Sequence, residues 1–156
     1  MNLSVHGLSH KTAPINIREK IAFDSDQILN ALPRLNSESG IRESMIISTC
    51  NRTEMYCNTA EGMENEPLQW VSNYLNLALA ALSPHFYNYY GEQAIKHTLR
   101  VGSGLDSLVL GESQILGQLK KAHQLAVQAG TVGKMIDKLM QVAFSTSKLI
   151  RSKTEI

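Results

Sequence analysis

The sequence predicts an α+β domain in which a small antiparallel or mixed sheet is covered by helices. Three observations support this prediction. Short apolar segments of strand length alternate along the chain with longer segments whose apolar residues recur at helical spacing. With 156 residues, 43% of them hydrophobic, the chain is long enough to bury one core. Two long amphipathic segments close the chain, and they are expected to be its longest helices.

The first half of the chain is predicted to hold three strands and two helices. In order, these are a strand over 1–9, helices over 15–23 and 26–35, a loop over 36–40, and strands over 44–49 and 53–59. Leu3 and Val5 alternate with other side chains in the first strand, as expected for a sheet. Thr12 and Pro14 suit a helix start, and Asp24 is placed to cap the second helix. A polar segment that ends in glycine indicates the loop, and an uninterrupted apolar run marks the strand over 44–49 as buried.

The second half is predicted to be mainly helical. Helices are expected over 67–82, 92–101, 113–129 and from 133 onward, with a short aromatic strand over 86–90. In the two closing helices apolar residues recur three to four positions apart, as at Ile115 and Leu119 and again at Ile136 and Met140. The whole is expected to be a ferredoxin-like sandwich followed by a long C-terminal helix. No cap or glycine ends that helix, so Ile156 is expected to be a cut point in a longer protein.

Composition excludes several classes of protein. Fifteen Lys and Arg against 14 Asp and Glu leave a net charge of +1, without the basic excess of a dedicated nucleic-acid binder. Any contact with RNA is therefore expected to be local or shared with another part of the protein. No apolar run approaches the ~20 residues of a membrane span, and residues 1–20 lack the apolar stretch of a secretory signal. We therefore expect a cytoplasmic protein without membrane contact.

The most unusual polar cluster is STCNRTE at residues 48–54, where an apolar strand gives way to a turn. A turn on a rigid strand exposes a side chain, and the positive charge of Arg52 favours the thiolate of Cys50. Asn51, Thr49 and the backbone N–H groups of the turn are suited to holding a substrate or an oxyanion. On spacing alone two interpretations stay open: Cys50 is a nucleophile, or it is a packed thiol beside a hairpin turn.

The remaining cysteine and the histidines are weaker candidates on local grounds. Cys57 lies within the following strand and is predicted to be a packed, inert thiol. The spacing of the two cysteines does not fit a zinc or redox pair, so no metal is expected. His10 ends the first strand and is a candidate pocket residue, whereas His97 lies within a helix. Folding would have to bring one of them to the thiol to make a nucleophile–base pair.

A glycine-punctuated stretch over 102–112 indicates close backbone approach, either to a ligand or to a neighbouring helix. It is not a dinucleotide-binding fingerprint, because the third glycine is misplaced and a helix precedes it. Gln114, Gln118 and Lys121 follow at helical spacing. They form either a substrate-facing polar row or a solvated face.

Three segments together resemble the glutamyl-tRNA reductase family. GLSHKTAP at 7–14, with Arg18 and Glu19, is similar to that family's opening motif. STCNRTE at 48–54 resembles its active-site motif, and SGLDSLVLGESQILGQLK at 103–120 resembles its longest motif. The resemblance is to the N-terminal catalytic domain, which we assign to 1–132. Residues 133–156 would then begin the spinal helix that joins the domains in this family.

The resemblance implies NADPH-dependent reduction of glutamyl-tRNA(Glu) to glutamate-1-semialdehyde, the first step of the C5 route to 5-aminolevulinate and tetrapyrroles. It implies that Cys50 is the nucleophile and carries a thioester that hydride resolves to the aldehyde. His97 matches a histidine important for activity in the family, with orientation or proton transfer as its role. Arg52 is expected to pair with the side-chain carboxylate of the glutamyl group. The positions that match the family's substrate pocket are Thr49, Asn51, Arg52, Ser107, Glu112, Ser113, Gln114 and Gln118.

The family's NADPH-binding and dimerisation domains have no counterpart in these residues. NADPH is therefore expected to bind a domain missing from this chain. Alone, the chain is expected to act only as a glutamyl-tRNA esterase, which forms the thioester and hydrolyses it slowly without making the semialdehyde. The resemblance also implies a homodimer for the full-length protein, glutamate-1-semialdehyde aminomutase as a partner, and haem as a feedback regulator.

Two other functions are consistent with the residues. One is a non-catalytic α+β module that binds a partner, with Cys50 a structural thiol. The other is a generic cysteine acyl-transfer or hydrolase domain without tRNA specificity. Ready alkylation of Cys50 below pH 8 would distinguish an enzyme from a binding module. Protection by glutamyl-tRNA, but not by uncharged tRNA or free glutamate, would distinguish the reductase domain from a generic thiol enzyme.

Overall fold

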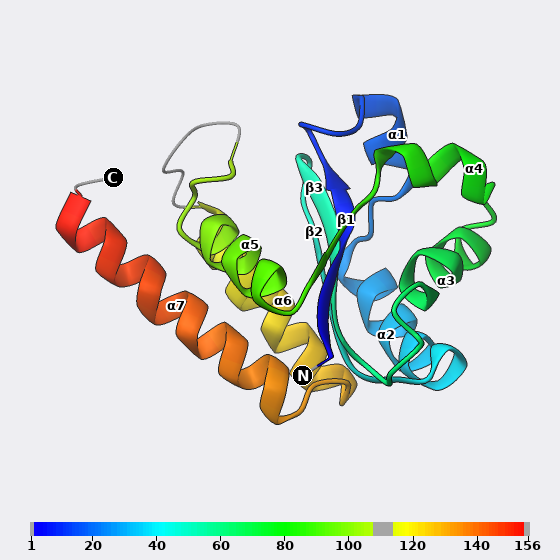
Figure 1. The fold of residues 1–156 in the computed structure, drawn as a ribbon. Helices are drawn as coiled ribbons and strands as arrows, with labels where there is room; N and C mark the ends of the chain where they lie inside the picture. The colour runs from blue at the N-terminus through cyan, green and yellow to red at the C-terminus, as the bar shows by residue number, and fades with distance from the viewer. Residues whose placement is uncertain (1, 108–113, 155–156) are drawn as a thin grey trace.

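A computed structural model describes residues 2–107 and 114–154 and confirms the predicted α+β class (Figure 1). The strands are β1 (Leu3–Ser9), β2 (Ile41–Ser48), β3 (Arg52–Thr59) and β4 (Tyr87–Tyr90). The helices are α1 (Ile15–Lys20), α2 (Ser25–Ser39), α3 (Glu66–Tyr74), α4 (Leu79–Leu82), α5 (Glu92–Gly102), α6 (Gln114–Ala129) and α7 (Lys134–Thr154). A 3-10 turn, η1 (Ser83–His85), precedes β4. Within these described residues no helix is long and apolar enough to cross a membrane.

The four strands form one sheet in the order β2-β3-β1-β4, and each neighbouring pair is antiparallel. Helices cover both faces: α2, α3 and α4 lie on one side of the sheet, and α5 and α7 lie on the other (Figure 1). The α6 helix packs against β2 and α2. Because both faces are covered, all seven residues of the central strand β1 are buried. The sheet was predicted to be antiparallel or mixed, and it is antiparallel.

The predicted loop over 36–40 is wrong, because α2 continues to Ser39. The helix starts with a capping box in which Asp24 and Gln27 each accept from the other's backbone N–H. It ends at Gly40, whose φ of 65° is the left-handed conformation that glycine adopts without strain. Leu35 and Ser39 are both buried against the rest of the fold. Tertiary packing therefore extends the helix through a segment whose local composition favours a loop.

The single helix predicted over 67–82 is also wrong, because two helices occupy this segment. The α3 helix ends at Tyr74, and α4 begins only at Leu79. Between them Asn76 has a φ of 54°, a left-handed conformation that breaks a right-handed helix. Two other boundaries shift: α1 ends three residues before the predicted end at residue 23, and β2 begins three residues before the predicted start at residue 44.

The last helix is attached to the sheet by a strand carboxylate. Glu43 of β2 accepts hydrogen bonds from the backbone N–H groups of Gly133, at 2.6 Å, and Ile136, at 3.0 Å. The Asn58 side chain donates to the other carboxylate oxygen at 2.8 Å. A carboxylate at this position satisfies free N–H groups of the first turn and complements the helix dipole. The N-terminal part of α7 is thereby held against the same sheet that carries the STCNRTE segment.

Candidate active site

The STCNRTE segment forms the tight turn between β2 and β3, and Cys50 lies at its tip. The Thr49 backbone N–H donates to the Arg52 carbonyl at 2.7 Å. The Thr49 hydroxyl accepts from the N–H groups of Asn51, at 3.1 Å, and Arg52, at 3.2 Å. The His10 N–H donates to the Asn51 carbonyl at 2.8 Å, which ties the turn to the end of β1. The turn is therefore rigid, and it presents Cys50 as an exposed free thiol.

The second cysteine is of the opposite kind. Cys57 is fully buried in β3, and burial raises the pKa of its thiol. A thiol kept protonated and out of reach of solvent is neither a nucleophile nor a metal ligand. The prediction of a packed Cys57 is confirmed, and its inertness stays a prediction.

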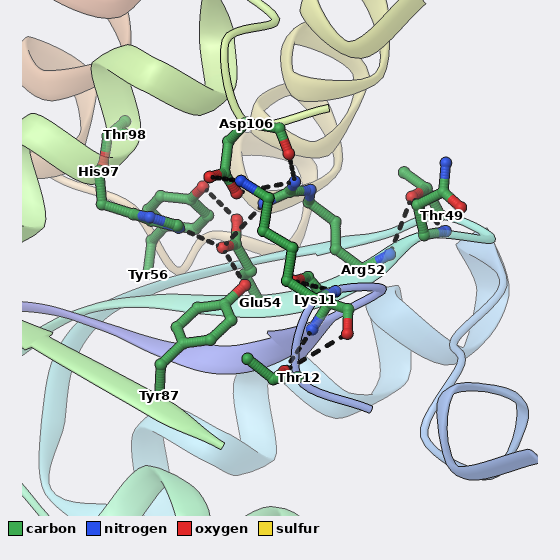
Figure 2. A network of polar contacts seen from close by, with 12 residues as sticks. Lys11, Thr12, Thr49, Arg52, Glu54, Tyr56, Tyr87, His97, Thr98 and Asp106 are labelled. Carbon is green, nitrogen blue, oxygen red and sulfur yellow. Dashed lines mark hydrogen bonds and ion pairs between the residues drawn. The ribbon is translucent and has the colours of Figure 1, made fainter. Parts of the chain in front are cut away.

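A completely buried carboxylate, that of Glu54 on β3, lies at the centre of the polar network in Figure 2. Tyr56 donates its hydroxyl to Oε1 at 2.7 Å, and Tyr87 of β4 donates its hydroxyl to Oε2 at 2.6 Å. His97 of α5 contacts Oε2 through Nε2, and Arg52 Nη1 lies 3.4 Å from the same oxygen. Four donors from three elements therefore converge on one carboxylate.

The electrostatics of this network keep Glu54 ionised. Burial opposes the charge, but the hydrogen bond and charge of His97, the charge of Arg52 and the hydrogen bond of Tyr87 outweigh it, so the pKa of Glu54 falls to about 2. Burial and the neighbouring Glu54 charge raise the pKa of Tyr56 and of Tyr87, which keeps both hydroxyls protonated as donors.

The Arg52 side chain is buried, with 2% of its surface exposed, and its guanidinium joins Glu54 to a second carboxylate. Its Nη2 donates to the Asp106 carbonyl at 2.7 Å and to the Asp106 carboxylate at 3.1 Å. Asp106 lies in the turns that follow α5, and its other carboxylate oxygen accepts from Lys11 Nζ at 2.9 Å. Burial by itself would raise the pKa of Asp106. The Lys11 hydrogen bond and the Arg52 charge outweigh that effect, so the pKa of Asp106 is lowered.

His97 belongs to this network rather than standing alone. Its ring is buried, stacks on Tyr89 at 4.5 Å between ring centroids, and lies 5.2 Å from the ring of Tyr87. An ionised carboxylate only accepts hydrogen bonds, so the His97 ring carries a hydrogen on Nε2, where it contacts Glu54. The contact holds the ring in place and commits this nitrogen to Glu54.

The glycine of the GLSHKTAP segment has a steric role in the network. Gly7 of β1 lies between Glu54 and Tyr87 in the sheet register. A Cβ at Gly7 would lie 2.2 Å from the Thr53 carbonyl oxygen and 2.8 Å from the Glu54 Cα. With no side chain at this position, the strands approach closely and the Tyr87 hydroxyl reaches Glu54.

The other sequence-predicted positions are less closely grouped. Ser107 is half-buried next to Asp106, and its N–H donates to the Gly104 carbonyl at 3.3 Å. Gln114 and Gln118 are exposed at the start of α6. Glu112 and Ser113 lie outside the described residues. Across the described part of the chain, no cluster of three or more His, Cys, Asp or Glu side chains is placed to hold a metal ion.

His10 lies beside the turn. Its side chain is half-buried, and its Nδ1 has no hydrogen-bond partner although solvent does not reach it. Burial, followed by the charges of Arg52 and Lys11, lowers the pKa of His10. The ring is therefore a neutral polar group with unused hydrogen-bonding capacity, close to the other charged groups of the site.

Sequence reasoning missed five members of the network: Lys11, Glu54, Tyr56, Tyr87 and Asp106. A signal was present for four of them. Lys11, Glu54 and Asp106 lie in the three segments that resemble the family. Arg52, Glu54 and Tyr56 are spaced two apart in one strand, so their side chains lie on one face of the sheet. Tyr87 comes from a distant segment, and no local pattern connects it to the turn.

The chain is similar in sequence and in fold to known proteins. A family described as glutamyl-tRNAGlu reductase, N-terminal domain, matches residues 6–154. The chain is 48% identical over 156 residues to a glutamyl-tRNA reductase of Shewanella oneidensis, and 49% identical to one of Shewanella putrefaciens. A solved glutamyl-tRNA reductase from Methanopyrus kandleri superposes with a TM-score of 0.82 at 29% identity, covering 98% of this chain and 35% of that one. The match covers the whole of this chain but only 37% of the length of each of the two Shewanella proteins.

Proposed function

The chain belongs to the glutamyl-tRNA reductase family, whose N-terminal domain it matches, and from that premise we propose that Cys50 accepts the glutamyl group of glutamyl-tRNA(Glu) as a thioester. The Cys50 thiolate attacks the carbonyl carbon of the aminoacyl ester. A bond forms between Sγ and that carbon, the ester bond to the ribose oxygen breaks, and the released hydroxyl of the tRNA takes up a proton. The ester is already activated, so the step needs no nucleotide triphosphate.

One observation carries this proposal: Cys50 is exposed at the tip of a rigid turn, and a buried arginine follows it two residues later. The thiol is accessible, as a nucleophile must be. The hydrogen bonds within the turn hold Cys50 in place. We assign to the side-chain amide of Asn51, the next residue, the hydrogen bond to the attacked carbonyl. Arg52 supplies a permanent positive charge for the side-chain carboxylate of the glutamyl group.

We assign the reduction to the longer proteins of the family. There NADPH, bound outside these residues, would supply the hydride that converts the thioester to glutamate-1-semialdehyde. Gly102 and Gly104 do not form a dinucleotide-binding turn: Gly102 ends the helix α5 and Gly104 follows it, whereas the phosphate-binding turn of a dinucleotide fold follows a strand. The proposed activity of this chain alone is therefore acylation of Cys50 followed by slow hydrolysis, which amounts to esterase activity on glutamyl-tRNA.

His97 is assigned a positioning role in this reaction. Because its Nε2 is committed to Glu54, it acts through that carboxylate on Arg52. His97→Asn should then slow Cys50 acylation by glutamyl-tRNA while leaving acylation by the same tRNA charged with glutamine nearly unchanged. Equal slowing with both esters would instead indicate proton transfer at the reacting carbonyl.

The main experiment mixes the chain with tRNA(Glu) carrying isotope-labelled glutamate, quenches in acid and locates the label by peptide mass spectrometry. We expect a glutamyl adduct on Cys50 and faster deacylation than in buffer, both abolished by Cys50→Ser. We expect no semialdehyde when NADPH is added. Absence of both the adduct and the faster deacylation would refute the proposal, and semialdehyde formation would refute the restriction to esterase activity.

Further features of the family are proposed for the longer protein. The antiparallel order β2-β3-β1-β4 supports a ferredoxin-like domain over 1–132. Along the chain, helices connect β1 to β2 and β3 to β4, as in that fold. We propose that α7 is the first part of the spinal helix. A homodimer, contact with glutamate-1-semialdehyde aminomutase, haem feedback and a cytoplasmic location remain proposals for the full-length protein.

A further inference from the structure

Two cations from separate segments hold one carboxylate at the edge of the buried network. Lys11, in the turn after β1, donates to one oxygen of Asp106 at 2.9 Å. Arg52, at the start of β3, donates to the other oxygen at 3.1 Å. This arrangement, with one cation at each oxygen, would suit any carboxylate that reached the same place.

The two carboxylates on Arg52 differ in how firmly they are held. Glu54 is fully buried and is contacted by four donors, so its displacement would leave buried donors, Arg52 among them, without this partner. The side chain of Asp106 is 14% exposed, and its second partner, Lys11, has 52% of its side chain exposed. Of the two, Asp106 is the carboxylate that can be exchanged at lower cost, because it is less buried than Glu54 and one of its two cations, Lys11, is exposed.

Charge balance indicates the same exchange. Lys11 and Arg52 both contact the Asp106 carboxylate. A second carboxylate placed beside Asp106 on these two cations would put two negative side chains next to each other, which is unfavourable. A carboxylate that replaces Asp106 keeps the balance.

We propose that Lys11 and Arg52 together form the site for the side-chain carboxylate of the glutamyl group, and that Asp106 occupies this site until the substrate displaces it. The inference rests on the proposed function and adds two specificity residues to it. Lys11 contributes the second charge of the site, and Asp106 acts as an internal competitor.

The test measures the rate of Cys50 acylation at sub-saturating concentrations of tRNA(Glu) charged with glutamate or with glutamine. Glutamine has the same shape but no charge, so the ratio of the two rates isolates carboxylate recognition from binding of the tRNA. Lys11→Met should lower acylation by the glutamyl ester about tenfold, the size expected for one charged hydrogen bond. The glutaminyl ester should react at the wild-type rate.

The Asp106→Asn variant shows whether Asp106 competes with the substrate carboxylate or only holds Lys11 and Arg52 in place. If Asp106 competes with substrate, the variant should raise acylation by the glutamyl ester several-fold, because a neutral amide holds the two cations less tightly. The Asp106 carbonyl still accepts from Arg52 in this variant, so the arginine keeps a partner. Combining Asp106→Asn with Lys11→Met should abolish that gain.

Lys20→Met is the matched control, since Lys20 is an exposed lysine on α1 that stands outside the network. It should lower both rates equally or not at all. Circular dichroism confirms that each variant is folded. Slower glutamyl acylation in Asp106→Asn, or equal losses for both esters in Lys11→Met, would overturn the inference. Absence of acylation in the wild-type chain would instead refute the proposed function itself.

Discussion

Replacing Glu54 with glutamine should destabilise the chain more than any other isosteric change of an acidic side chain in the network. The substitution preserves volume and removes only the charge beside Arg52. A glutamine amide can still accept on one side, and the Tyr56 hydroxyl can reverse its role and accept from the new amide group. The predicted effect is therefore mainly electrostatic.

The magnitude follows from the shift in pKa. A fall in the pKa of Glu54 from 4.5 to about 2 corresponds to roughly 3 kcal/mol of net stabilisation of the ionised form. Removing one member of a buried ion pair costs about 3–5 kcal/mol, and Asp106 remains as a partner of Arg52, so the lower end applies. For a chain of this size a loss of about 3 kcal/mol lowers the melting temperature by roughly 6–12 °C.

The pH dependence has a definite sign. The folded-state pKa of Glu54 lies below its unfolded value, so its contribution is fully present above about pH 4.5 and is lost as the pH falls toward 2. The difference in unfolding free energy between wild type and Glu54→Gln should therefore be largest near neutral pH and shrink near pH 3.

Urea denaturation followed by far-UV circular dichroism near pH 7 and near pH 3 measures this difference. Glu61→Gln is the control, because Glu61 is an exposed glutamate in the turn before α3 and stands outside the network. That variant should unfold at the same urea concentration as wild type. A Glu54→Gln variant as stable as wild type at neutral pH, or a difference that is unchanged at low pH, would refute the reasoning.

Three further outcomes follow from the packing. Gly7→Ala should lower the free energy of unfolding by about 3 kcal/mol, because the new methyl group overlaps the neighbouring strand. Gly117→Ala, on an open helical surface of α6, should raise it by about 0.5–1 kcal/mol. Thermal denaturation compares the two variants, and a Gly7→Ala variant as stable as wild type would contradict the steric argument. Glu43→Gln should weaken the attachment of α7 by about 1–2 kcal/mol, visible as faster hydrogen exchange at its first turn, and unchanged exchange would show that the carboxylate charge is not needed there. Iodoacetamide should modify Cys50 in the folded chain and Cys57 only after unfolding, as peptide mass spectrometry would show; equal labelling of both in the folded chain would contradict the assigned burial.

Much of the fold could be predicted from short-range patterns. Alternation at Leu3 and Val5 placed β1, and the Asp24 cap placed the start of α2, because both signals depend only on residues a few positions apart. The failures came where distant packing overrode local preference. The α2 helix continues to Ser39 because its last turn is buried, and Asn76 interrupts a segment whose apolar spacing suits one helix.

The candidate site divides in the same way. The sequence by itself determined the STCNRTE turn, Cys50 as a candidate nucleophile and the family to which three segments are similar, since each of these depends on residues that are contiguous in the chain. The structure decided between the two interpretations of Cys50 that were open on spacing alone, because it shows the thiol exposed at the tip of the turn. Only the tertiary structure decided that Glu54 meets His97, 43 positions away, and that Arg52 meets Asp106, 54 positions away. Such contacts depend on strand order and register and on how α5 lies across the sheet. These are set by the packing of the whole core, so no local pattern specifies which buried charges become partners.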